Sequence, residues 1–150
     1  MAGALLWGSF AVLLAAVTLS DLRTRLISDR ALVAAAGLAM VTLASTAPEA
    51  LPGRLAAAGG AGGFLLLAAL ARPGGMGLGD VKLAAVLGLY LGRAVAPALL
   101  IAFAAGALWG LAIIVARGWS ARTRAIPFAP FLATGAAVAR LAADNVDPWS

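Results

Sequence analysis

The chain has 150 residues, of which 63% are hydrophobic and only 11% are charged, and its formal net charge is +5. This composition is too apolar for a soluble domain of that length and indicates an integral membrane protein. The sequence contains no cysteine and no histidine, which excludes disulfides, thiolate nucleophiles and the commonest metal ligands and general base. Proton transfer therefore falls to carboxylates, Lys82 or Tyr90, and we expect neither a metal ion nor another cofactor.

Six apolar segments predict about six transmembrane helices, which together form an all-α polytopic bundle with a single domain over residues 1–150. A spanning helix needs about 20 apolar residues. The first segment has no basic residue before it, so we expect it to remain as a membrane helix rather than be cleaved as a signal. The predicted segments are residues 3–19, 31–47, 55–71, 81–92, 98–116 and 126–143.

The fourth segment is short, because twelve helical residues span only about 18 Å of a hydrocarbon core about 30 Å thick. Either it continues past Arg93, or the glycine-rich stretch before it enters the protein at membrane depth. A five-helix arrangement is the alternative. Small residues four apart (Gly59 and Gly63, Gly88 and Gly92, Gly106 and Gly110) predict close helix packing in the bundle and leave a homo-oligomer open.

The basic residues orient the bundle. Alternate loops place eight of them on one side, and Arg54, Arg93 and Arg140 on the other. Basic loops remain cytoplasmic, so both chain termini are predicted to be extracytoplasmic. Topology alone explains the positive net charge, and we expect no nucleic-acid partner. The eight predicted on the cytoplasmic side are Arg23, Arg25, Arg30, Arg72, Lys82, Arg117, Arg122 and Arg124.

The six acidic residues differ in what they imply. Glu49, Asp144 and Asp147 fall in polar outer segments, where plain solvation explains them, and Ser28 or Asp29 suits the N-cap of the second helix. Asp21 instead follows the apolar run "LLAAVTLSD" directly, where pairing with Arg23 or Arg25 is the structural alternative.

Asp80 follows a glycine-rich stretch, "GGMGLGD", at the start of the fourth segment. It could cap that helix, but four glycines in seven residues suggest backbone that bends unusually or admits another chain. An ionisable group at membrane depth indicates function by default.

Two aspartates on different helices at the same membrane face suit one mechanism in particular. Carboxyl groups about 3 Å apart do not both ionise readily, so such a pair holds one proton. The ionised member can take a proton from an attacking water, and the protonated member can polarise the carbonyl and later protonate the leaving amine. This is aspartic proteolysis, which needs no histidine, cysteine or metal.

Three stretches resemble segments of the type IV prepilin leader peptidases, the GxGD membrane aspartic proteases. "GGMGLGDVKLAAVLG" resembles their GxGD segment, "SDLRTRLISDRAL" the segment of their first aspartate, and "IPFAPFLATG" the proline-rich opening of their last helix. The resemblance implies that Asp21 and Asp80 are catalytic. It assigns motif or support roles to Gly77, Gly79, Pro127, Phe128 and Pro130.

The resemblance implies an endopeptidase in the bacterial cell membrane that removes a short basic leader from prepilin-like proteins of type IV pilus or secretion systems. The cut lies on the cytoplasmic side, just before the substrate's hydrophobic helix. Longer family members also N-methylate the new amino terminus and carry a cysteine-rich insert. Since this sequence has no cysteine, it resembles the short, peptidase-only members, and methyltransferase activity is not expected.

Several alternatives remain open from the sequence. Lys82 and Arg23 each lie two residues after a candidate acid, where they could tune the aspartates or simply anchor the helix ends in the membrane. Lys82 with Ser28 or Ser120 could form a serine–lysine protease. A small carrier with intramembrane acids or a non-catalytic membrane scaffold are the other possibilities.

Overall fold

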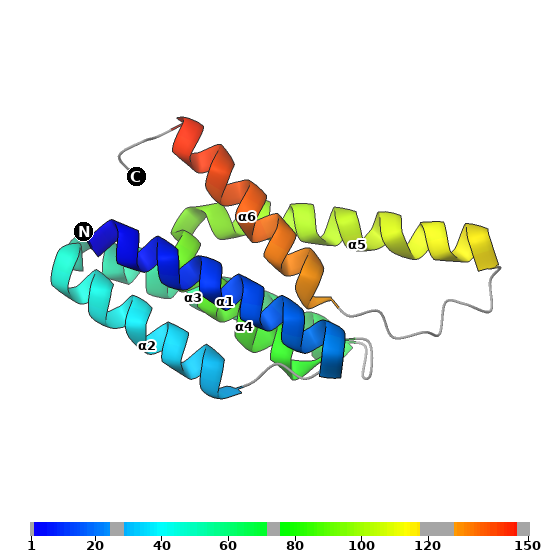
Figure 1. Cartoon of the computed structure of the whole chain (residues 1–150), viewed down its shortest axis with the longest axis horizontal. Coiled ribbons are helices and arrows are strands. Elements are labelled where there is room, and N and C mark those ends of the chain that lie inside the picture. The colour runs from blue at the N-terminus through cyan, green and yellow to red at the C-terminus, as the bar shows by residue number, and fades with distance from the viewer. Residues whose placement is uncertain (1, 25–28, 72–75, 118–127, 147–150) are drawn as a thin grey trace.

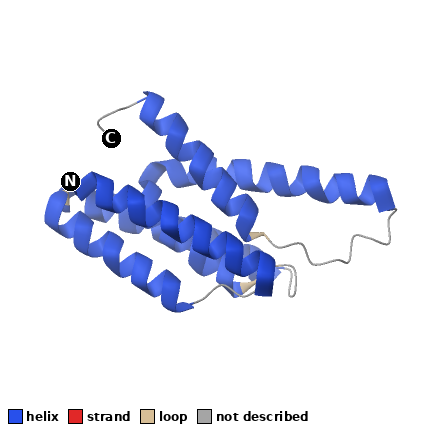
Figure 2. Ribbon diagram, viewed as in Figure 1, coloured by secondary structure: helices blue, strands red, loops and turns tan. Residues whose placement is uncertain are grey.

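The computed structural model describes residues 2–24, 29–71, 76–117 and 128–146, and within them it contains only helices and short connections (Figures 1 and 2). This confirms the all-α fold class. The α-helices are α1 (Ala2–Thr24), α2 (Asp29–Thr46), α3 (Leu51–Ala71), α4 (Leu78–Leu91), α5 (Val95–Arg117) and α6 (Ala129–Val146). Two 3-10 turns, η1 (Pro48–Ala50) and η2 (Gly92–Ala94), precede α3 and α5.

Three helical stretches in the described residues are long and apolar enough to cross a membrane. They are Asp29–Thr46, Pro48–Ala71 and Leu78–Ala116, and the last contains both α4 and α5. Shorter apolar stretches lie within α1 (Leu6–Leu19) and α6 (Ala129–Ala143). Large apolar side chains on the outside of the bundle, such as Val115, Leu100 and Val33, are mostly exposed. Such an apolar exterior suits lipid rather than water as the surrounding solvent.

Helix α4 lies at the centre of the bundle. It contacts α2, α3 and α6, and the ring of its Tyr90 packs against Phe10 of α1 at 5.3 Å between ring centroids. Nearly every residue from Leu83 to Leu91 is buried, as expected for a helix that is apolar on all sides. The Tyr90 hydroxyl donates to the Ala35 carbonyl at 3.0 Å and lies 3.2 Å from Ser9 Oγ, which links α4 to α2 and α1.

The predicted break after the fourth segment is confirmed at Gly92, and the alternative in which that helix continues past Arg93 is wrong. Gly92 has a φ of 55°, the left-handed conformation that glycine adopts readily, and its N–H donates to the Gly88 carbonyl. The fourteen residues of α4 span about 21 Å. The helix is therefore shorter than the hydrocarbon core, and α5 continues the chain from η2 (Figure 1).

Glycines permit two close helix crossings. A Cβ added at Gly88 would lie 2.5 Å from the Ala58 Cα of α3, and one added at Gly62 would lie 2.9 Å from Ala85 Cβ of α4. At the second crossing, a Cβ on Gly135 of α6 would overlap the Ala98 carbonyl of α5. Gly59, Gly63 and Gly110, which also belong to the predicted small-residue pairs, have no such neighbour.

Replacing Gly88 by Ala is expected to destabilise the bundle, because the added methyl meets backbone atoms of α3 that cannot move independently. Overpacking of this kind costs about 1–3 kcal/mol, which would lower the thermal unfolding midpoint measured in detergent. Gly59→Ala is the matched control, since nothing lies within 4 Å of its added Cβ. Equal midpoints for the two variants would contradict the close α3–α4 crossing.

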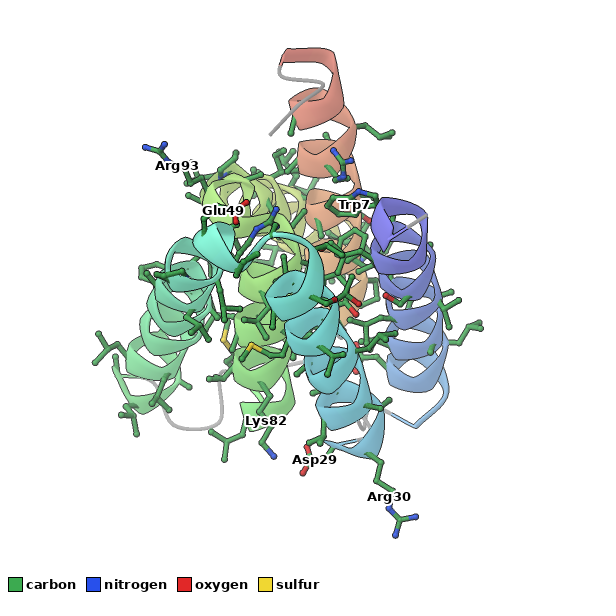
Figure 3. All side chains as sticks on the ribbon, turned by 90° about the vertical axis from the view of Figure 1, so that its left-hand side faces the viewer. Trp7, Asp29, Arg30, Glu49, Lys82 and Arg93 are labelled. Atoms are coloured by element: carbon green, nitrogen blue, oxygen red, sulfur yellow. The ribbon has the colours of Figure 1, made fainter. Side chains whose placement is uncertain are left out.

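Charged residues separate to the two ends of the bundle. Figure 3 places Asp29, Arg30 and Lys82 at one end and Trp7, Glu49 and Arg93 at the other. Arg54, Arg93 and Arg140 line one cavity at the second end, which agrees with their predicted grouping on the same side. Four of the basic residues predicted on the opposite side, Arg25, Arg72, Arg122 and Arg124, lie outside the described residues.

Candidate active site

The candidate site lies where α1 ends and α4 begins, at the end of the bundle that carries Asp29 and Lys82 (Figures 1 and 3). Asp21 is in the last turn of α1, and Asp80 is in the first turn of α4. Their carboxyl groups are close enough to repel each other electrostatically. The two acids, which are 59 positions apart in the sequence, therefore face the same region.

Asp21 occupies a position that helix stability does not explain. Its side chain is only 6% exposed, although it is ionisable and lies in an apolar bundle. It also lies at the C-terminal end of α1, where the helix dipole disfavours negative charge by about 0.3–1 kcal/mol in exposed settings. An acid placed against both burial and the dipole is a candidate for function rather than for stability.

Asp80 is half-buried in the first turn of α4, and its own N–H donates to the Gly77 carbonyl at 3.1 Å. An acid in a first turn complements the positive end of the helix dipole, so its sequence position alone is compatible with a helix-start role. The N-cap itself is Gly77, which has no side chain to cap the helix. Proximity to the buried carboxyl of Asp21 distinguishes Asp80 from an ordinary acid at a helix start.

Gly77 lies beside the Asp80 carboxyl group. Its φ of −77° and ψ of 145° are accessible to any L-residue, so the backbone conformation does not require glycine there. A Cβ at this position would lie 3.7 Å from Asp80 Oδ2. The absence of a side chain instead leaves space next to that oxygen. Gly79, the second motif glycine, is half-buried in the same turn.

Lys82 has a partner other than the two candidate acids. Its Nζ donates to both carboxylate oxygens of Asp29 at 2.8 Å, which joins the start of α4 to the start of α2. The side chains are 53% and 64% exposed, so this ion pair contributes at most about 1 kcal/mol. Sequence reasoning missed this pair, because Asp29 alone suggested only a helix cap.

Lys82→Met is expected to change stability by less than about 1 kcal/mol and to leave peptide cleavage largely intact. The reason is that the ammonium group joins two helix ends and is not needed by a two-aspartate mechanism. Cleavage of a prepilin-type peptide by the purified variant, measured beside its thermal midpoint, tests this. Complete loss of cleavage in a folded variant would instead favour a serine–lysine mechanism, whose candidate serines, Ser28 and Ser120, lie outside the described residues.

The proline-rich segment opens α6 and packs onto α5. The Phe128 ring lies 5.2 Å from that of Phe103, and a Cβ on Gly106 would be 3.2 Å from the same Phe128 ring. Pro130 is the second residue of α6, where its missing N–H removes no helical hydrogen bond. Pro127 lies outside the described residues. The contacts of Phe128 thus support the α5–α6 junction.

The described residues contain no group of three or more histidine, cysteine, aspartate or glutamate side chains that could hold a metal ion. At the end of the bundle that carries Asp29 and Lys82, the carboxyl groups of Asp21, which is buried, and Asp80, which is half-buried, lie near each other beside the glycine turn. Such a pair can hold one proton and act as acid and base toward a bound water.

Comparison with known proteins gives a consistent result. The chain matches the type IV leader peptidase family over residues 8–111. It is 38% identical over 141 residues to the prepilin leader peptidase/N-methyltransferase of Bacillus subtilis (strain 168), covering 91% of this chain and 55% of that protein. It is 40% identical over 76 residues to the protein of the same name from Aeromonas salmonicida (strain A449), covering 50% of this chain and 26% of the relative.

The chain thus spans about half the length of the Bacillus subtilis relative, and about a quarter of the Aeromonas salmonicida relative is matched. No solved structure matches it significantly. The matched region contains both Asp21 and Asp80, together with Gly77, Gly79 and Lys82.

Proposed function

Because the chain belongs to the type IV leader peptidase family, we propose that it is a membrane aspartic endopeptidase that removes the basic leader from prepilin-like proteins. The observation that carries the proposal is that Asp21 and Asp80 lie at the same end of the bundle, near enough for electrostatic repulsion, with Asp21 buried there against the preference of its helix. In the proposed topology six helices cross the bacterial cell membrane, both termini are extracytoplasmic, and the aspartates face the cytoplasm.

The proposed reaction uses the pair as one acid–base unit. The ionised carboxylate takes a proton from water as the water oxygen attacks the scissile carbonyl carbon, and the protonated carboxyl gives its proton to the carbonyl oxygen. The tetrahedral intermediate then collapses, the C–N bond breaks, and a proton passes to the leaving amine. One water is consumed and the pair again holds one proton. That proton is shared by the pair and is not assigned to either aspartate.

The side of the membrane on which the aspartates are proposed to lie supports a substrate with a basic leader. Arg30 and Lys82 lie at the same end as the aspartates, as expected of a cytoplasmic face. A leader that remains on that side of the membrane would reach the site without crossing the bilayer. The substrate's hydrophobic helix would meanwhile lie in lipid beside the bundle.

The test is cleavage of a prepilin-type peptide by the purified protein in detergent, followed by mass spectrometry. We expect a single cut between the basic leader and the hydrophobic segment. Addition of S-adenosylmethionine is expected to leave the mass of the new amino terminus unchanged, since we propose a peptidase without methyltransferase activity. A scaffold predicts no cleavage, and a folded, pure protein that leaves the peptide intact would contradict the proposal.

A further inference from the structure

An apolar groove lies between α3 and α5 on the outside of the bundle, and it measures about 610 Å³. Both helices belong to stretches that are long and apolar enough to cross a membrane, so the groove opens toward lipid. The α5 side of the groove includes Leu100 and Phe103. The α3 side consists largely of small residues at helical spacing, which are Gly53, Ala56, Ala57 and Gly60.

Packing within the described part of the chain does not explain the glycines of this groove. A Cβ added at Gly53 or Gly60 would meet nothing within 4 Å, whereas one added at Gly88 would overlap a neighbouring helix. A glycine inside a helix costs about 1 kcal/mol relative to alanine. In lipid, small residues on a helix surface allow the backbone of a second helix to approach closely. The α3 side of the groove is therefore suited to receive a helix.

Contacts between α3 and α4 place the groove relative to Asp80. A Cβ on Gly62 would lie 3.6 Å from the Val81 carbonyl oxygen, so Gly62 is nearly level with the residue that follows Asp80. Phe64 and Phe103, whose rings meet edge to face at 6.1 Å between centroids, line the end of the groove nearest that level. This inner end of the groove therefore lies at the depth of Asp80, to within about one helical turn of 5.4 Å.

From its inner end the groove runs away from the aspartates, toward the opposite end of the bundle. Its outer end is lined by Gly53, near the start of α3, and by Gly92, which follows α4. The part of α3 between Gly53 and Phe64 is about 16 Å long at 1.5 Å per residue. That length accommodates about three turns of a bound helix.

We propose that the α3–α5 groove binds the hydrophobic helix of the substrate, an inference that rests on the proposed peptidase function. Cleavage just before that helix requires its first turn to lie at the depth of the aspartates, while the leader stays on their side of the membrane. The groove begins at this depth and continues in the direction in which such a helix would run. The residues before the helix would then pass the exposed Gly77 turn to reach Asp80.

The absence of cysteine from the sequence makes disulfide capture a direct test of this docking. The assay uses the full chain with Asp80→Asn, so that the substrate stays whole. The probe is a peptide with a basic leader, a prepilin-type cut site and a helix of about 20 apolar residues that carries one cysteine in its first half. Leu100→Cys, which lines the groove and is 71% exposed, is expected to form a disulfide with this peptide.

Leu108→Cys is the matched control for capture. Leu108 is 68% exposed on the same helix but does not line the groove. Its cysteine is therefore expected to form no disulfide with the peptide above background. Both leucines have exposed side chains, so both variants are expected to fold, which their thermal midpoints check.

Kinetics of the protein with both aspartates intact provide a second readout. Two peptides share one leader and one cut site, and only the longer peptide contains the hydrophobic helix. Gly60→Leu is expected to raise KM for the longer peptide about tenfold more than KM for the shorter one, the scale of overpacking by one side chain. Gly59→Leu is the matched control, because Gly59 does not line the groove and a Cβ on either glycine meets nothing within 4 Å. It should affect the two peptides alike.

Three results would overturn the docking proposal. One is equal capture of the peptide by Leu100→Cys and Leu108→Cys. Another is a disulfide between two copies of Leu100→Cys in place of capture, which would make the groove an interface between copies of this chain. The third is a Gly60→Leu variant that changes the two KM values in the same proportion as Gly59→Leu does, which would mean that lipid alone covers the groove.

Failure of docking and failure of the peptidase give different results. Capture by Leu100→Cys needs no cleavage, because it is measured in the Asp80→Asn protein. If the protein with both aspartates captures the peptide but never cuts it, the peptidase proposal alone is contradicted. If it cuts both peptides while Leu100→Cys captures neither more nor less than Leu108→Cys, the docking proposal alone is contradicted.

Discussion

Asp21→Asn and Asp80→Asn are each expected to reduce peptide cleavage by at least about 10³-fold, the scale of losing an acid–base group. Amide side chains keep the shape of the carboxyl groups but can neither accept the proton of an attacking water nor donate one to the leaving amine. The measurement is the rate of cleavage of a prepilin-type peptide by purified variants. The double variant is expected to be no worse than either single one, because residues that act as a unit are strongly non-additive.

Stability separates this prediction from a structural explanation. Asparagine has nearly the same size and shape as aspartate, so Asp21→Asn is expected to remain folded at the end of α1 while abolishing cleavage. Asp29→Asn is the matched control, since it makes the same change at the same end of the bundle in an exposed ion pair. Normal cleavage by a folded Asp21 or Asp80 variant, or equal loss in Asp29→Asn, would contradict a two-aspartate mechanism.

The sequence predicted the helical architecture well because the signals involved are local. Apolar runs predicted the helices, and the break predicted between the segments at 81–92 and 98–116 corresponds to the turn that the structure places at Gly92–Ala94. The residues at which the helices end were predicted less accurately. The first helix was predicted to end at Leu19 but continues to Thr24, since backbone hydrogen bonding does not stop where hydrophobicity does. This extension places Asp21 inside the last turn of α1 rather than in a loop.

The tertiary contacts could not be predicted in the same way. The spacing of glycines showed which helices could approach closely, but not which face met a neighbour. Gly59 and Gly63 face open space, whereas Gly62, between them in the sequence, contacts α4. The Lys82–Asp29 pair likewise depends on the relative rotation of α2 and α4. For the two aspartates, carboxylate chemistry and a family resemblance indicated that the side chains lie near each other. Their spacing in the sequence alone did not predict this.

Enlarging Gly77 is expected to have the second-largest effect on activity. Its backbone conformation is open to any L-residue, so Gly77→Val should fold normally. The added side chain would occupy the space next to Asp80 Oδ2, because even a Cβ would lie 3.7 Å from that oxygen. A water and a scissile carbonyl must come within about 3–3.5 Å of the reacting groups, so the variant is expected to lose about 10²-fold in kcat/KM.

A graded series makes this test sharp. Gly77→Ala should lose less activity than Gly77→Val, since its methyl group makes only ordinary contact with the carboxyl oxygen. Leu78→Val is the matched control, because Leu78 is the next residue and is 63% exposed, so its replacement should leave cleavage unchanged. Unaltered thermal midpoints with activity falling from Gly to Ala to Val would assign the glycine to substrate access. Equal activity across the series would mean that the peptide approaches Asp80 from another side.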